Sequence, residues 1–98
     1  MGAVRPKVVI ECEREFSRGE VKFVVISYTS TEGKMETREF QSLQEAERFL
    51  NKEFRSQRIR REYLKEAEIV VITSSGDFKC RATITFEPSP PRPRLRPR

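Results

Sequence analysis

The segment SLQEAERFLNKEF, residues 42–54, decides the fold of this 98-residue chain, because it is the clearest helix in it. Ser42 followed by Glu45 is a capping box, in which the hydroxyl accepts a hydrogen bond from a first-turn amide and the carboxylate reaches back to the cap residue. The apolar residues that form one helical stripe are Leu43, Ala46, Phe49, Leu50 and Phe54. We predict an amphipathic helix that begins at about residue 43.

The end of this helix is less regular. Ile59 and Tyr63 fall on the opposite side of the helical wheel from the apolar stripe. The helix therefore either bends or unwinds near Ser56, or its last turns expose these two apolar side chains unless the packing partner changes. We predict that it reaches at least residue 55 and continues to about Leu64.

Three segments before the helix have the composition of β-strands. KVVIECERE (Lys7–Glu15) alternates apolar and polar residues, and VKFVVISYTS (Val21–Ser30) is rich in β-branched and aromatic residues on both faces. METREF (Met35–Phe40) follows a tight turn at Gly33 and is predicted to be a returning edge strand.

Two further strands follow the helix. Ile69–Thr73 is short and apolar on both faces, and residues 78–86 alternate. The inward positions of this last strand are Phe78, Cys80, Ala82, Ile84 and Phe86. The order β-β-β-α-β-β predicts an α+β fold, a mainly antiparallel five-stranded sheet with one helix packed on one face. We assign residues 1–87 to a single domain and residues 88–98 to a disordered Pro/Arg-rich basic tail.

One helix covers only one face of a sheet, yet several strands are apolar on both faces. Another copy of the same sheet would cover the second face most economically. We expect a homodimer that forms through the helix-free face or strand to strand across an exposed edge. The interface residues expected on the helix-free face are Val9, Val24, Ile26 and Tyr28. The alternative is a monomer whose strongly coiled sheet wraps its own core.

Most catalytic and metal chemistry is disfavoured by the residue types. The chain has no histidine, which excludes Ser-His and Cys-His nucleophilic pairs within it. It has neither a phosphate-binding Gly-x-x-x-x-Gly-Lys-Ser/Thr loop nor a Gly-x-Gly-x-x-Gly motif. Two cysteines cannot complete a tetrahedral zinc site. We expect a protein that is not an enzyme and that has no cofactor and no metal.

Cys12 and Cys80 both fall on inward positions of their strands. In a reducing cytosol the default state of such residues is a buried free thiol that packs as a small apolar side chain. A disulfide is the alternative if the first and last strands are neighbours and the source is a hyperthermophile.

No apolar run approaches the roughly 20 residues that span a bilayer, and the first residues lack the apolar core of a signal peptide. We therefore expect an intracellular, cytoplasmic protein without membrane contact. Charged residues make up 36% of the chain, and Asn and Gln are few, which is a thermophile-like balance. Such small basic chains are typical of accessory proteins of thermophiles or archaeal viruses, a similarity of composition alone.

The positive charge is unevenly distributed. The formal net charge is +5, but residues 1–87 are almost neutral, and the last eleven residues supply four arginines and no acid. The second basic stretch is RSQRIRREYLK, residues 55–65, which contains one aromatic residue and one glutamate. Proline keeps the tail extended, so that alternate arginines lie about 6 Å apart, close to the phosphate spacing along one nucleic-acid strand.

This distribution predicts nucleic-acid binding, most simply to duplex DNA or RNA, with low sequence specificity. The basic helix end and the extended arm would contact phosphates, and Tyr63 would supply a stacking contact. The predicted nucleic-acid-binding residues are Arg55, Arg58, Arg60, Arg61, Tyr63, Lys65, Arg92, Arg94, Arg96 and Arg98. The alternative is a homodimeric protein-interaction module whose tail only solubilises it or binds a partner.

Overall fold

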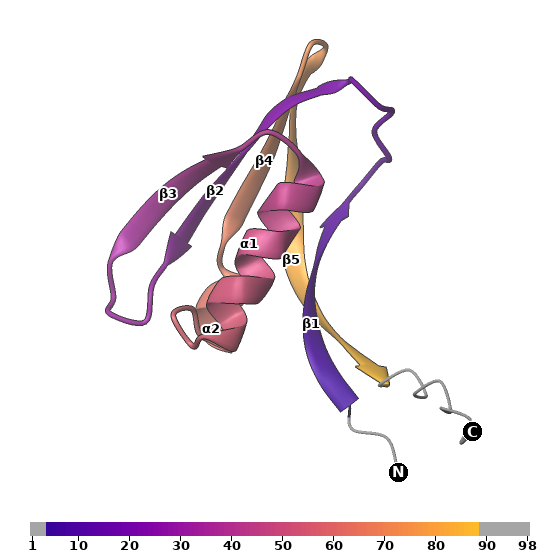
Figure 1. The fold of residues 1–98 in the computed structure, drawn as a ribbon. Helices are drawn as coiled ribbons and strands as arrows, with labels where there is room; N and C mark the ends of the chain where they lie inside the picture. Colours follow the sequence, from indigo (N-terminus) through magenta and orange to yellow (C-terminus); the bar gives the residue numbers. More distant parts are fainter. Residues whose placement is uncertain (1–3, 89–98) are drawn as a thin grey trace, which may run out of the picture.

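The computed structural model describes residues 4–88 of the chain. Its strands and helices are, in order, β1 (Val4–Cys12), β2 (Val21–Thr29), β3 (Met35–Phe40), α1 (Leu43–Arg55), α2 (Arg61–Lys65), β4 (Glu68–Thr73) and β5 (Gly76–Pro88). The strands form one antiparallel sheet in the order β1-β5-β4-β2-β3, and α1 packs against it (Figure 1). This confirms the predicted α+β class and the edge position of β3.

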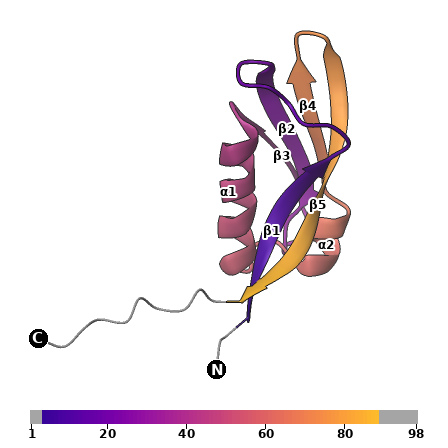
Figure 2. The same ribbon diagram turned by 90° about the vertical axis from the view of Figure 1, so that its right-hand side faces the viewer.

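The core lies between α1 and one face of the sheet (Figure 2). Ala46 and Leu50 of α1 are fully buried, as are Val24 and Ile26 of β2. Burial of a side chain such as Leu50 contributes about 1.5–3 kcal/mol relative to leaving it exposed. Ser42 caps the helix as predicted, because its hydroxyl accepts a hydrogen bond from the Glu45 N–H at 3.1 Å. Neither helix within residues 4–88 has the length and apolar composition needed to cross a membrane.

The predicted continuation of the helix to Leu64 is wrong. α1 ends at Arg55, and Gln57 adopts a positive φ of 63°, which turns the chain out of the helix. After this turn Ile59 points into the core, where it is only 1% exposed. The physical reason is the one that the helical wheel indicated: an uninterrupted helix would hold Ile59 away from the core, and the break allows it to be buried.

The short helix α2 takes the place of a missing strand. β4 pairs with β5 only as far as Cys80, so the later part of β5 has no β4 partner. α2 lies beside this part of β5, below the start of β4 (Figures 1 and 2), and contacts both β5 and β2. Leu64 anchors α2 because its side chain is 1% exposed and belongs to the core.

The sheet face assigned to three of the four predicted dimer-interface residues is wrong, whereas the dimer itself stays a prediction. Val24, Ile26 and Tyr28 are buried beneath α1, and the Tyr28 ring packs edge-on against Phe49 with 5.7 Å between centroids. Only Val9 lies on the face that α1 leaves uncovered. The half-buried apolar residues of β2 and β4 on that face are Phe23, Val25, Val70 and Ile72. Because β2 is apolar on both faces, its sequence does not tell which face meets the helix.

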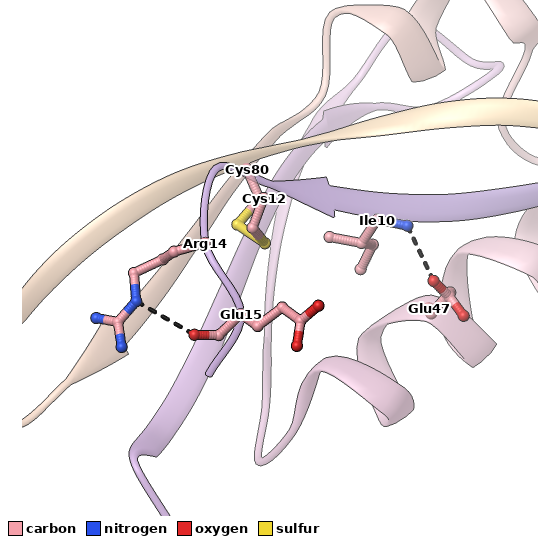
Figure 3. The surroundings of a disulfide bond; sticks show 6 residues. All are labelled: Ile10, Cys12, Arg14, Glu15, Glu47 and Cys80. Carbon is pink, nitrogen blue, oxygen red and sulfur yellow. Dashed lines mark hydrogen bonds between the residues drawn. A yellow bond between two sulfur atoms is a disulfide. The ribbon is translucent and has the colours of Figure 1, made fainter. Parts of the chain in front are cut away.

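The expectation of free thiols is also wrong, because Cys12 and Cys80 form a disulfide (Figure 3). The antiparallel register of β1 and β5 places the two residues directly opposite each other. Their Cα atoms are 4.4 Å apart, which is the spacing of an antiparallel pair that exchanges no backbone hydrogen bonds. The bond therefore joins the first strand of the chain to the last.

The outer edge of β1 is closed by two side chains of α1. Asn51 accepts a hydrogen bond from the Val8 N–H and donates one to the Val8 C=O, both at 2.9 Å. Glu47 accepts a hydrogen bond from the Ile10 N–H at 2.9 Å (Figure 3). Alternate residues of an antiparallel strand turn their backbone groups away from the partner, so these groups would otherwise be unpaired at the sheet edge.

Candidate nucleic-acid interface

A groove runs between α2 and the last part of β5, and we call it the α2–β5 groove. The groove forms because α2 occupies the place beside β5 where β4 would otherwise continue. A helix and a strand meet through their side chains and not through a ladder of backbone hydrogen bonds. Its volume is about 470 Å³. The residues that line it are Arg61, Leu64, Lys65, Arg81, Ala82, Thr83, Ile84 and Phe86.

The lining of the α2–β5 groove is cationic. Arg61 and Lys65 stand one helical turn apart on α2, and Arg81 enters from β5. No acidic side chain of residues 4–88 lines this groove, and none of its three cations forms an ion pair with an acid in that range. Three cations around one hollow favour binding of an anion, although Arg81 also has Glu11 of β1 as its cross-strand neighbour.

An exposed aromatic ring stands at the rim of the groove. Phe86 is 55% exposed, and the Arg61 guanidinium lies over its ring, 5.6 Å from the centroid. This contradicts the inward position predicted for Phe86, because β5 extends beyond both β4 and the core at this point. A guanidinium stacked on an open ring is a combination that can receive a base and its phosphate together.

The structure separates the cations that the sequence presents as one basic stretch. Arg55 lines a different hollow, which runs along α1 and has a volume of about 1000 Å³. Two acids, Glu45 and Glu47, also line this hollow. Arg58 is paired with Glu53, with 3.5 Å between guanidinium and carboxylate. Arg60 lines a separate small hollow beside α2, together with Arg61. Of the predicted residues that the structure describes, Arg61 and Lys65 alone line the α2–β5 groove.

Tyr63 does not take the stacking position that the sequence suggested. It is half-buried and packs against the core, whereas Phe86 is the open ring. Sequence reasoning missed both Phe86 and Arg81. The only available signal was their place near the end of the longest alternating strand, and the role of each depends on α2 folding back beside that strand.

The predicted arm residues Arg92, Arg94, Arg96 and Arg98 lie outside the described residues. By connectivity the arm follows Pro88, two residues after Phe86.

Within residues 4–88, no three His, Cys, Asp or Glu side chains gather in a way that could hold a metal ion. Comparisons with protein-family models, with curated proteins and with solved structures gave no match for this chain. The function is therefore inferred from the residues of the α2–β5 groove.

Proposed function

We propose that this protein binds nucleic acid through the α2–β5 groove, mainly by contacts to phosphates and with low sequence specificity. The observation that supports this proposal most strongly is a groove that combines three cations, no acid and an exposed phenylalanine. Arginine and lysine neutralise phosphates, and an open aromatic face stacks on any base. Among residues 4–88, no amide or carboxylate side chain lines the groove to read base edges, so specificity is expected to be low.

The four arginines of the C-terminal arm would extend the same binding surface. The arm starts two residues after Phe86 in the sequence, and its prolines reduce the conformational entropy that is lost when an extended chain docks. Phosphates that leave the groove along one strand would then meet successive arginines of the arm.

The cations of the groove give the first test. Replacing Arg61, Lys65 and Arg81 with glutamine should reduce the slope of log K against log salt by about 2–3, because each lost phosphate contact removes about 0.9 on duplex DNA and about 0.7 on a single strand. Fluorescence anisotropy of labelled duplex and single-stranded DNA and RNA at several salt concentrations measures this slope.

The matched control for this triple variant carries the same loss of charge elsewhere. Arg18, Lys22 and Lys34 are exposed and none of them lines the α2–β5 groove. Their replacement with glutamine should leave the slope nearly unchanged. Equal effects of the two triple variants would show that the protein attracts polyanions only through its net charge, and the groove would lose its role.

Phe86 gives a second test that is independent of charge. Phe86→Leu keeps an apolar side chain but removes the ring, and stacking on an aromatic contributes about 1–3 kcal/mol per base. We expect single-stranded DNA to bind about 5–150-fold more weakly, with the same salt slope as the wild type. Unchanged affinity in the anisotropy titration would exclude Phe86 as a stacking platform.

A protein-interaction module is the second candidate, and one observation favours it. The face without α1 carries half-buried apolar side chains, among them Val25, Val70 and Ile72. Apolar association is far less sensitive to salt than phosphate binding. A partner that stays bound at high salt and is lost with Val70→Glu would support this function.

A further inference from the structure

The two edge strands of the sheet, β1 and β3, differ in whether another element covers their outward backbone groups. Side chains of α1 close the edge of β1, as described above. β3, at the other edge, pairs only with β2 among residues 4–88. An open edge is a template for pairing with another chain, and the charges that the edge strand carries decide which registers are favourable.

The hydrogen-bond pattern shows which residues of β3 face the open edge. The Ser30 N–H donates to the Lys34 C=O at 2.8 Å, so these two residues form a hydrogen-bonded pair of the hairpin. Pairs of this kind alternate along an antiparallel ladder. The backbone groups of Met35, Thr37 and Glu39 therefore point away from β2 toward the open edge.

Charge selects one register for pairing this edge with a second copy of itself. A two-fold axis at Thr37 places Glu36 opposite Arg38 of the second copy, twice. An axis at Glu36 would place two glutamates opposite each other, and an axis at Arg38 would place two arginines opposite each other, and both like-charge pairs are unfavourable. A two-fold axis that lies between two residues is excluded. It would place a residue whose backbone groups face outward opposite a residue whose backbone groups face inward.

We propose that two copies of this chain pair through β3, antiparallel about Thr37, and form a continuous ten-stranded sheet. Three hydrogen-bonded pairs along the shared edge would supply about six backbone hydrogen bonds. Glu36 and Arg38 have side chains that are 36% and 56% exposed, and they pair with each other within one chain at 3.5 Å. In the dimer the two intrachain pairs would lie side by side across the edge, each carboxylate also facing the guanidinium of the second copy. No residue of β3 lines the α2–β5 groove, so this dimer does not depend on the proposed function.

The oligomeric state of the full chain is the first test. A six-residue edge buries less surface than a standard interface of about 1,600 Å², so we expect a dimer that dissociates on dilution in sedimentation velocity. Thr37→Pro removes the outward N–H at the two-fold axis, and proline is tolerated at an edge position whose N–H faces solvent. This variant should be monomeric, whereas Thr37→Val, which keeps the N–H, should still dimerise.

Cross-linking tests the register itself and remains informative if Thr37→Pro fails to fold. In the proposed dimer the two copies of residue 37 face each other with Cβ atoms about 5 Å apart, whereas the two copies of residue 39 are about 13 Å apart along the strands. A thiol cross-linker too short for the second spacing should therefore join Thr37→Cys into a covalent dimer and leave Glu39→Cys monomeric.

Reversing the charges provides a third, independent measurement. Glu36→Arg alone should weaken the dimer, because it opposes two cations, and the double variant E36R/R38E should restore it. A wild-type chain that stays monomeric at high concentration would overturn the proposal. So would a dimer that survives Thr37→Pro, or one that cross-links Glu39→Cys as well as Thr37→Cys, because either result would assign the interface to another surface or register.

Discussion

Replacing Cys12 and Cys80 together with serine is expected to lower the free energy of unfolding by about 4 kcal/mol. The disulfide closes a loop with a sequence separation of 68, and the chain-entropy model gives about 4 kcal/mol for a loop of that length. For a domain of this size the midpoint of thermal unfolding should fall by roughly 15–30 °C. The loss should be large because β1 has β5 as its only strand partner within residues 4–88.

Thermal and denaturant unfolding of the wild type with and without a reductant measures the same quantity without a mutation. Each single variant, Cys12→Ser or Cys80→Ser, should be as unstable as the double variant, because either one removes the bond. Equal unfolding midpoints for the oxidised and the reduced wild type would contradict the stabilising role of the disulfide.

Asn51→Leu is expected to destabilise the protein by about 2 kcal/mol. The substitution leaves the Val8 N–H and C=O without their partners, and an unsatisfied buried polar group costs about 1–3 kcal/mol. It also removes the hydrogen bond from the Asn51 side chain to the Glu47 C=O. Because the site is only partly buried, water can form hydrogen bonds with the freed Val8 groups. The loss of stability is therefore smaller than the sum for two fully buried unsatisfied groups.

Denaturant unfolding checks this value, and Gln44→Leu is the matched control, since Gln44 is an exposed amide on the same helix. The Val8 amide should also exchange its proton faster with solvent in Asn51→Leu, because the edge of β1 is then open. If Asn51→Leu costs no more than Gln44→Leu, the contact between α1 and the edge of β1 does not stabilise the fold.

Local patterns in the sequence were sufficient for most of the fold. The capping serine, the helical stripe and the turn at Gly33 are each determined by neighbours in the chain, and the structure has all three. The end of α1 was harder to predict. It depends on whether Ile59 gains more from the core than the helix loses at Gln57, which is a balance of tertiary and local energies.

Contacts between distant segments could not be read from the sequence. The disulfide, the bonds of Asn51 to β1 and the identity of the buried face of β2 all depend on strand order. The same distinction between local and distant contacts applies to the residues of the candidate site. Arg61 and Lys65 were found by their local charge, whereas Arg81 and Phe86 join them only because α2 lies beside the end of β5.

Binding of nucleic acid in the α2–β5 groove is tested most directly by chemical-shift mapping. A short unlabelled DNA strand is added to isotope-labelled full-length protein at low salt, and the backbone amide chemical shifts are followed. We expect the largest changes within Arg61–Lys65 and Arg81–Phe86. Amide shifts that do not change, or that change only along α1 near Arg48 and Lys52, would contradict binding in the groove.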